Sequence, residues 1–251
     1  MKLQELVRIL DTELQPWQFR DYCPNGLQVE GRDEVLRVAT GVTACEAVID
    51  QAIAWKADAI LVHHGYFWKN EQAQITGMKK RRLQKLLTHD ISLLGYHLPL
   101  DAHTTMGNNA TLAKLLGLTE TGPLDPAESR PIGNVGEVDQ STSLDDFSAM
   151  IESTLGRKPL VISGGDHPIK TVAWCTGGAQ SLLGKAVEAG VDAYISGEIS
   201  ESTVHTAREE GIHYISAGHH ATERGGVQAL GAWLAAEYGI EHQFFDIGNP
   251  V

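Results

Sequence analysis

Cysteine is scarce in this sequence, and the three cysteines that occur are isolated from one another. Cys23, Cys45 and Cys175 form no CxxC pair, and their odd number leaves at least one thiol unpaired within the chain. This pattern argues against a disulfide framework and against a structural zinc knot built on thiolates. We therefore expect a cytoplasmic protein that is stabilised by an ordinary apolar core.

Long apolar runs are also missing. No segment approaches the ~20 apolar residues that a membrane-spanning helix needs, and the N-terminal MKLQELVRILDTEL lacks the apolar core of a secretion signal. The apolar residues of this segment instead recur at helical spacing and predict an amphipathic helix; they are Leu3, Leu6, Val7, Leu10 and Leu14. We expect no membrane partner.

Positive charge is in short supply, with 20 lysines and arginines against 32 acidic residues and a formal net charge of -12. Such a chain is not attracted to phosphate backbones, so a nucleic-acid partner is possible but not favoured. The one basic run, Lys79–Arg82, begins a predicted helix with Leu83, Leu86 and Leu87 on its buried side. A solvated helix face explains this run better than a phosphate-binding patch.

What the sequence does contain is an alternation of strands and helices. Strands are expected at 35–43, 58–62 and 91–96, with helices between them and a further helix, NNATLAKLLG, that stops at Gly117. This order predicts right-handed crossovers and a largely parallel sheet covered by helices on both faces. The fold class expected is α/β, with two similar α/β lobes from an internal repeat, mostly parallel central sheets and flanking helices.

A change of composition separates the two halves. Residues 118–143 are rich in proline, glycine and serine and look like a connection between lobes. The helix SLDDFSAMIESTLG follows, with Ser143 as its cap, and a second α/β series starts near Lys158. We expect residues 1–125 plus 215–251 to form a metal-site lobe and residues 126–214 a second, related lobe.

The internal repeat is visible in two alignments. VATGVTACEAVIDQAIAWKADAILVHHG aligns without gaps on VAWCTGGAQSLLGKAVEAGVDAYISGEI, which places Asp58 on Asp192. ISLLGYHLPLD (91–101) parallels HYISAGHHATE (213–223), each an apolar strand that ends in a histidine with a carboxylate four residues later. Clefts in such sheets lie beyond the carboxyl ends of the strands, so these side chains are candidate site residues.

The strand DAILV ends in two adjacent histidines and a glycine. Neighbouring side chains on a regular strand point to opposite faces, so His63 and His64 converge only where the backbone turns, which Gly65 permits. The alternative is one hydrogen-bonded core histidine and one solvent-facing histidine. Together with the other strand ends, the candidate metal ligands are His63, His64, His97, Asp101, His219 and Glu223.

Imidazole and carboxylate ligands suit Fe, Mn, Zn or Ni and are poor ligands for Ca. Six ligands are too many for one catalytic ion, and we expect two divalent transition-metal ions per subunit, about 3.5–4 Å apart. Glu223 is the candidate bridging ligand, because it opens a predicted helix, and Glu223 and His97 are the candidate catalytic residues. Alternatively, His97 only orients Asp101, and Glu198 either faces the site or caps the helix that follows it.

Four motifs in order resemble the Nif-three-like family, whose members are often labelled type-2 GTP cyclohydrolase I homologues. They are PNGLQVEG (24–31), the strand-end HHG, HLPLDAH (97–103) and GHHATERGG (218–226). The resemblance covers nearly the whole chain and fits the short form of the family, although Gly65 stands where many relatives carry proline. It implies a dinuclear metal centre on the ligands named above and a ring-shaped homohexamer whose sites face an inner cavity.

The expected function is a dinuclear-metal-dependent hydrolase acting on a nucleotide or related small molecule, with GTP as the candidate that the resemblance names. The chain has no GxxxxGK[ST] loop and no arginine cluster to grip a triphosphate. Two alternatives remain open. One is a non-catalytic, metal-stabilised hexameric ring that acts as a protein or nucleic-acid binding scaffold, and the other is metal storage.

Overall fold

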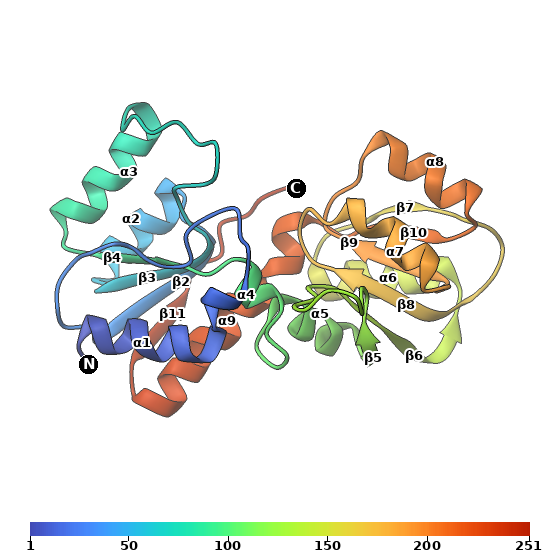
Figure 1. Ribbon diagram of the computed structural model, residues 1–251, viewed down its shortest axis with the longest axis horizontal. Helices are drawn as coiled ribbons and strands as arrows, with labels where there is room; N and C mark the ends of the chain where they lie inside the picture. The colour runs from blue at the N-terminus through green and yellow to red at the C-terminus, as the bar shows by residue number, and fades with distance from the viewer. The chain divides into compact units, whose positions relative to one another are not determined.

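Two β-sheets, of five and six strands, organise the chain in the computed structural model, which describes residues 1–251 (Figure 1). Each sheet belongs to one of two compact units. Unit 1 comprises Met1–Gly107 and Gly226–Ile247, and unit 2 comprises Asn108–Gly225 and Gly248–Val251. The mixed α/β class with two sheets and flanking helices is as expected from the sequence.

The boundaries of the units differ from those expected. The segments 108–125, 215–225 and 248–251 were assigned to the first lobe, whereas the structure places them in unit 2. The reason is strand pairing: residues 118–123 pair with a neighbouring strand of the second sheet, and residues 213–216 lie inside that same sheet. The expected boundary was based on composition. Membership of a sheet is instead decided by backbone hydrogen bonding.

The sheet of unit 1 has the strand order β1-β4-β3-β2-β11. Three pairings are parallel, and only β1 runs antiparallel to its neighbour β4. The strands are β1 (Gly26–Val29), β2 (Arg37–Thr43), β3 (Ala59–His64), β4 (Ser92–Gly95) and β11 (Glu241–Phe244). The carboxyl ends of β3 and β4 therefore lie at the same edge of the sheet.

Helices cover both faces of this sheet (Figure 1). Strand alternation explains why: Val38 and Leu61 pack with α1 (Leu3–Leu14) and with α9 (His219–Tyr238), which begins in unit 2. Ala39 and Ile60 face the other way, towards α2 (Glu46–Ala54) and α3 (Gly77–Thr88). The expected amphipathic α1 is present, but Leu87 of α3, expected on the buried side, is 59% exposed.

The sheet of unit 2 has the order β5-β6-β8-β9-β10-β7 and is mixed, because three of its five pairings are antiparallel. Its strands are β5 (Leu118–Pro123), β6 (Asn134–Thr142), β7 (Leu160–Ile162), β8 (Ile169–Cys175), β9 (Ala193–Ser196) and β10 (His213–Ser216). Residues 118–143 were expected to be a connection, and this was wrong. They form the antiparallel pair β5–β6, which has few buried apolar side chains and so lacks a clear strand pattern.

The helices of unit 2 also cover both faces of its sheet. Residues of α5 and α6 pack with Val172 and Trp174, whereas residues of α7 and α8 pack with Ala173 and Tyr194. The helices are α5 (Asn108–Leu116), α6 (Leu144–Leu155), α7 (Leu183–Glu188) and α8 (Glu201–Glu209). The predicted cap of α6 is present, since the backbone N–H of Asp146 donates to Oγ of Ser143 at 3.1 Å.

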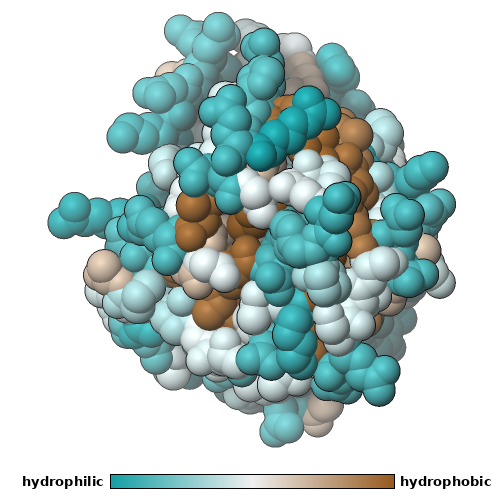
Figure 2. All heavy atoms as spheres, turned by 90° about the vertical axis from the view of Figure 1, so that its right-hand side faces the viewer, coloured by the Kyte–Doolittle hydropathy of each residue, from teal (hydrophilic) through white to brown (hydrophobic).

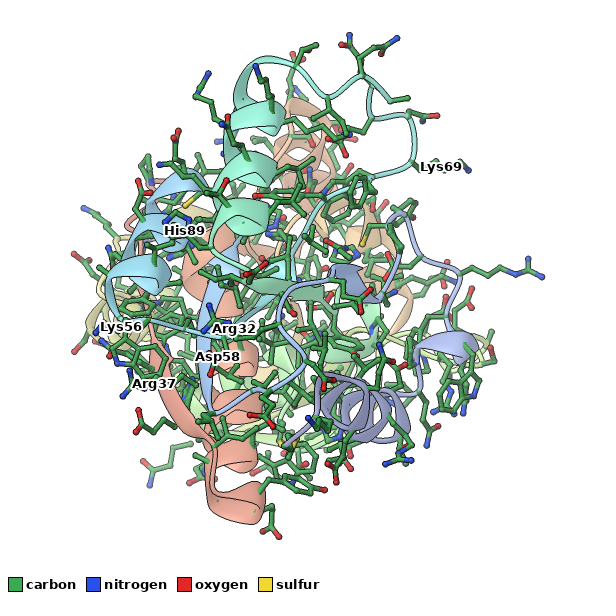
Figure 3. The ribbon with its side chains drawn as sticks, turned by 90° about the vertical axis from the view of Figure 1, so that its left-hand side faces the viewer. Arg32, Arg37, Lys56, Asp58, Lys69 and His89 are labelled. Atoms are coloured by element: carbon green, nitrogen blue, oxygen red, sulfur yellow. The ribbon has the colours of Figure 1, made fainter.

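The two units repeat one substructure at the start of their parallel strands. Oδ2 of Asp58 accepts hydrogen bonds from the backbone N–H groups of Leu36 and Arg37, at 2.8 and 2.9 Å. Oδ2 of Asp192 accepts from Lys170 and Thr171 at 2.8 and 2.7 Å, which are the positions that the alignment predicts. Figure 3 shows Asp58 beside Arg32 and Arg37 at this edge of unit 1, while Lys69 lies apart on the loop after β3.

The alignment of the third strands is shifted by one residue. Ser92 pairs with Ala59 in unit 1, and His213 pairs with Ala193 in unit 2, so Ser92 corresponds to His213. On this register His97 corresponds to Gly218, not to His219 as expected. Gly218, whose φ is +103°, is the extra residue between β10 and His219. The two histidines still follow equivalent strands.

None of the helices combines the length and the apolarity that a membrane crossing requires. The face of unit 2 in Figure 2 carries hydrophilic side chains with apolar areas between them. Apolar atoms contribute more than half of the surface of ordinary folded proteins, so this surface alone does not identify a binding face.

Candidate metal centre

The end of β3 in unit 1 brings the adjacent histidines together. The ring centroids of His63 and His64 lie 4.5 Å apart at the carboxyl end of β3, whose last residue is His64. His97, which immediately precedes the short helix α4 (Leu98–Asp101), has its ring 5.0 Å from that of His63 and 5.7 Å from that of His64. One nitrogen from each ring lies within 4.8 Å of the other two, which is close enough to share a metal ion.

Each of these three rings is held through Nδ1. Nδ1 of His63 donates to the backbone carbonyl of Tyr96 at 3.0 Å, and Nδ1 of His97 donates to Oδ1 of Asp21 at 2.7 Å. Nδ1 of His64 lies 3.2 Å from Oγ1 of Thr43. A histidine held at one ring nitrogen presents the other with a fixed tautomer and direction, as metal-ligating histidines do.

Asp101 adds a carboxylate to this group. Its Oδ1 lies 3.5 Å from Nε2 of His63, and the residue is 7% exposed. The single turn of α4 creates this position, because the backbone N–H of Asp101 donates to the carbonyl of His97 at 3.1 Å. The side chain of His97 bonds to Asp21, so the structure supports orientation of His97 by Asp21 and does not show His97 orienting Asp101.

Asp21 is the residue that sequence reasoning missed. It accepts hydrogen bonds from Nδ2 of Asn25 at 2.9 Å and from the backbone N–H of Leu98 at 3.0 Å, besides that from His97. Burial alone would raise the pKa of its carboxyl, but the hydrogen bond and charge of His97 outweigh burial and hold the pKa below its usual value. A signal was available: Asp21 lies just before the PNGLQVEG motif, and Asn25 of that motif accepts the backbone N–H of His97 at 2.7 Å.

Unit 2 contains a second histidine–carboxylate group. His219 begins α9, and Glu223 lies one turn later with Oε1 3.2 Å from Nε2 of His219. Nδ1 of His219 donates to Oε1 of Glu198 at 2.7 Å. Glu223 was expected to open its helix, but it lies inside α9, and the residue is 2% exposed.

Glu198 faces His219 and does not cap α8, which Ser200 caps instead. Burial lowers the pKa of His219, but hydrogen bonds to Glu223 and Glu198 and their charges outweigh it and raise the pKa to about 9. In the metal-free protein this imidazole is therefore protonated at neutral pH, and a metal ion has to displace that proton. Ion binding at this group should release protons.

A glycine makes room for the second group. Gly177, in the loop after β8, has φ of +69°, and a Cβ added there would lie 2.1 Å from Oε1 of Glu223 and 3.1 Å from Nε2 of His219. No other residue type fits that position without moving the carboxylate. The TGG sequence after β8 is thus part of the site, although it carries no ligand.

Other candidate residues lie outside these groups. Nε2 of His103 lies 3.1 Å from Oε1 of Glu13, so this histidine forms a separate pair. Cys23 lies with Asp21 and His97, and burial together with the charge of Asp21 raises the pKa of its thiol to about 12. The thiol is consequently protonated at neutral pH and is a poor ligand in that state.

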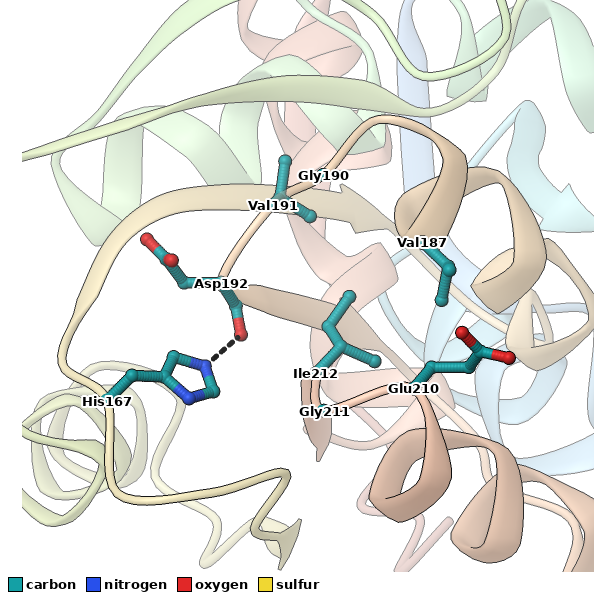
Figure 4. Close-up of a pocket in the computed structure, with 8 residues that line it drawn as sticks. All are labelled: His167, Val187, Gly190, Val191, Asp192, Glu210, Gly211 and Ile212. Carbon is teal, nitrogen blue, oxygen red and sulfur yellow. Dashed lines mark hydrogen bonds between the residues drawn. The ribbon is translucent and has the colours of Figure 1, made fainter.

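A cavity of about 280 Å³ in unit 2 is separate from the second group (Figure 4). It is lined by His167, Asp192, Glu210 and neighbouring residues, and Nε2 of His167 lies 3.4 Å from the backbone carbonyl of Asp192. These residues precede β9 and β10, whereas His219 and Glu223 follow β10. The cavity therefore lies at the opposite edge of the sheet.

A sequence model of one family, described as Duf34/NIF3 (NGG1p interacting factor 3), matches residues 1–250. The chain belongs to the Duf34/NIF3 family. A Pseudomonas aeruginosa relative named "GTP cyclohydrolase 1 type 2 homolog" is 53% identical over 99% of this chain and 98% of its own length. An Escherichia coli K12 relative with the same name is 49% identical over the whole of both chains.

Solved structures agree with this membership in the Duf34/NIF3 family. One, titled "protein ybgI, unknown function", matches with a TM-score of 0.97 and 49% identity over all of both chains. Another, from Thermus thermophilus, matches with a TM-score of 0.91 and 36% identity over the whole of both chains. The resemblance expected from the four motifs is thereby confirmed.

The donor set of this Duf34/NIF3 protein fits a divalent transition metal. The groups around His63 and His219 offer imidazole nitrogens and carboxylate oxygens, and each imidazole is oriented by a partner at Nδ1. Such nitrogen and oxygen ligands suit Zn, Fe, Mn and Ni better than Ca or Mg. The clusters could therefore hold metal, as the sequence predicts.

Proposed function

We propose that this protein is a metal-dependent hydrolase that acts on a nucleotide or related small molecule, with GTP as the first candidate. The observation that carries the proposal is that four histidine rings share one orientation. Nδ1 of His63, His64, His97 and His219 each lies within 3.2 Å of a protein oxygen, so Nε2 is the ring nitrogen turned away from that contact. A histidine that only stabilises a core needs no such uniform orientation.

The ligands proposed are those named from the sequence, and their number supports two divalent ions, each Fe, Mn, Zn or Ni. The proposed ligands within unit 1 are His63, His64, His97 and Asp101, and those within unit 2 are His219 and Glu223. Such ions supply Lewis-acid chemistry, which polarises a carbonyl or phosphoryl oxygen and activates water. The carboxylates balance the charge of the ions, and Asp21 and Glu198 hold the rings of His97 and His219.

Glu223 and His97 are the proposed catalytic residues. Glu223 is buried and keeps its carboxylate beside Nε2 of His219, so it is placed to accept a proton from water within the site. The acid–base role of His97 requires that Nε2 is free of metal; Asp21 accepts from Nδ1 at 2.7 Å and would then stabilise the protonated ring. Both roles use residues that are rigidly held.

The test combines metal analysis with a substrate screen. Protein loaded separately with Fe, Mn, Zn and Ni is assayed on GTP, other nucleotides and simple phosphoesters. Glu223→Gln should upset both ions and lower turnover by orders of magnitude, whereas Asp101→Asn should chiefly weaken one ion. His103→Ala is the matched control, since its partner is Glu13, and should keep metal and activity.

Two outcomes would overturn this proposal. A single tightly held ion under metal-replete conditions contradicts the dinuclear centre. Full metal content with no turnover of any substrate, and with every variant matching the parent, would replace the hydrolase with the non-catalytic scaffold.

We propose further that the chain assembles as a ring-shaped homohexamer in the cytoplasm. The hexamer rests on the family resemblance, and the location rests on three cysteines that form no disulfide. Light scattering on the purified protein tests the first, and fractionation of cells tests the second.

A further inference from the structure

An aromatic wall lies beside the imidazole cluster of unit 1. The indole of Trp68, three residues after Gly65, has its centroid 5.0 Å from the ring of His97 at an interplanar angle of 79°. It lies 5.9 Å from the ring of His64. Tyr22, which is 62% exposed, lies 6.5 Å from the ring of His97 at 63°. The rings of Trp68 and Tyr22 thus both lie at a steep angle to the imidazole of His97, a candidate ligand.

Hydrogen bonds hold this wall in place. Nε1 of Trp68 donates to the backbone carbonyl of Gly65 at 3.1 Å, and its backbone N–H donates to Oε2 of Glu71 at 3.0 Å. The backbone N–H of Lys69 donates to the carbonyl of Tyr22 at 2.6 Å and joins the two loops. Trp68 is therefore fixed relative to His97 and Tyr22.

Residues near Trp68 have left-handed backbone. Phe67 and Asn70 have φ of +64° and +73°, a region that costs a residue such as phenylalanine about 1–2 kcal/mol but that asparagine adopts more readily. Phe67 is stabilised there by Nζ of Lys79, 5.1 Å from its ring centroid. Strain of this kind persists only where surrounding contacts sustain it, and it gathers at functional sites. Trp68 lies between these two residues in the sequence.

The chemistry of the wall selects a class of ligand. The only hydrogen-bond donor of the indole is used by Gly65, so Trp68 offers apolar ring surface and no polar recognition. Aromatic faces bind planar rings by stacking, and this binding tolerates differences in ring substituents. A flat, unsaturated heterocycle matches such a surface, whereas a bare sugar phosphate does not.

We propose that Trp68, assisted by Tyr22, is a specificity-determining residue that stacks on a planar heterocyclic ring of the substrate. This inference rests on the proposed function, because it assigns the substrate class for that same centre. It places the ring of the substrate against the side of His97 that carries the two aromatic residues. It adds to the metal ligands a site that recognises the base of a nucleotide rather than its phosphates.

The test is calorimetric binding to the metal-loaded protein. The probes are the monophosphates of guanosine, adenosine and cytidine, with ribose 5-phosphate as the matched probe without a ring. Trp68→Leu should weaken binding of the best base-bearing probe about tenfold and leave ribose 5-phosphate unchanged. Trp68→Phe should restore most of the loss, and Tyr22→Leu should lose less. Trp17→Leu, at an indole 68% exposed in the turn after α1, is the control and should change nothing.

The possible results distinguish a failure of this stacking proposal from a failure of the proposed hydrolase function. Base-selective binding that depends on Trp68 without any turnover supports the inference while the hydrolase fails. Turnover of phosphoesters without a ring, with no preference for a base, overturns the inference and keeps the hydrolase. Equal losses for all probes, loss of metal in Trp68→Phe, or no base-bearing probe tighter than ribose 5-phosphate would each show that Trp68 only packs against the histidines.

Discussion

A carboxylate behind a histidine ring affects how well that histidine binds a metal, and Asp21 has this position behind His97. Asp21→Asn keeps the shape of the side chain but removes the charge that the Nδ1–H group faces. We expect metal affinity to fall about 10–100-fold, because partners of this kind raise the basicity of a ligating ring. Competition with a chromophoric chelator measures the change.

The chain offers a matched control for this variant. Glu13 pairs with Nε2 of His103 at 3.1 Å, so Glu13→Gln removes an equivalent carboxylate from a histidine outside the proposed ligands. Its metal affinity should match that of the parent. An equal loss in both variants would mean that net charge, and not the contact with His97, sets the affinity.

The space at Gly177 gives a second prediction for a single residue. Gly177→Ala should displace Glu223, because the new Cβ would lie 2.1 Å from its Oε1. Gly156→Ala is the control, since Gly156 has the same φ of +69° but no atom within 4 Å of the added Cβ. Both variants should lose about 1–2 kcal/mol of stability from backbone strain. Only Gly177→Ala should lose metal, as elemental analysis will show.

Much of the candidate site follows from local sequence, and the part that does not comes from long-range contacts. The proximity of His63 and His64 could be predicted because they are adjacent at the end of one strand. Asp21 reaches His97 from 76 positions away, a contact that no local pattern reveals. Trp68 lies between two residues with left-handed backbone, Phe67 and Asn70, and this conformation is unusual for phenylalanine.

At the scale of the elements, Asp58 and its counterpart Asp192 each connect the starts of two neighbouring parallel strands by hydrogen bonds. Burial would raise the pKa of Asp192, but hydrogen bonds from Thr171 and Lys170 outweigh it and hold the pKa below the ordinary 3.8. A depressed pKa means that the folded state favours the charged carboxylate. Its stabilisation is therefore fully present above pH 3.8 and is lost as the pH falls further, through the lower pKa of the folded state.

The prediction is a pH-dependent cost of Asp192→Asn. Near pH 6 the variant should be less stable by about 1 kcal/mol, a value suited to a partly exposed group. The difference in melting temperature from the parent should shrink as the pH falls below about 4. Asp166→Asn, an exposed change of the same charge in unit 2, is the control. A constant difference at all pH values would contradict the charge-based explanation.

The same element shows how far the fold could be predicted. The alignment of Asp58 on Asp192 is correct because an ungapped strand–helix–strand unit preserves spacing. The predicted alignment of the third strands is wrong by one residue because Gly218 adds a position before His219. The pair β5–β6 was missed because few of its residues are buried and it lacks a buried apolar face.

At the scale of the whole molecule, charge limits assembly. Each chain carries a formal net charge of -12, so a hexamer would bring together a formal charge of six times -12, or -72. Like charges at this density oppose association, and salt screens them beyond a distance of about 8–10 Å at physiological ionic strength. The proposed hexamer of 27.2 kDa chains should therefore be weakened by low salt and strengthened by moderate salt.

Sedimentation at several ionic strengths measures this dependence. We expect a mass near six chains at about 0.15 M salt and partial dissociation near 0.01 M, where charges interact over about 30 Å. Bound divalent cations would offset part of the repulsion, so chelation should shift the midpoint to higher salt. A hexamer that is stable at low salt, with and without metal, would mean that apolar contacts dominate the interface. A monomer under all conditions would remove the ring, and the scaffold that depends on it, while leaving the chemistry of the metal ligands to be tested on single chains.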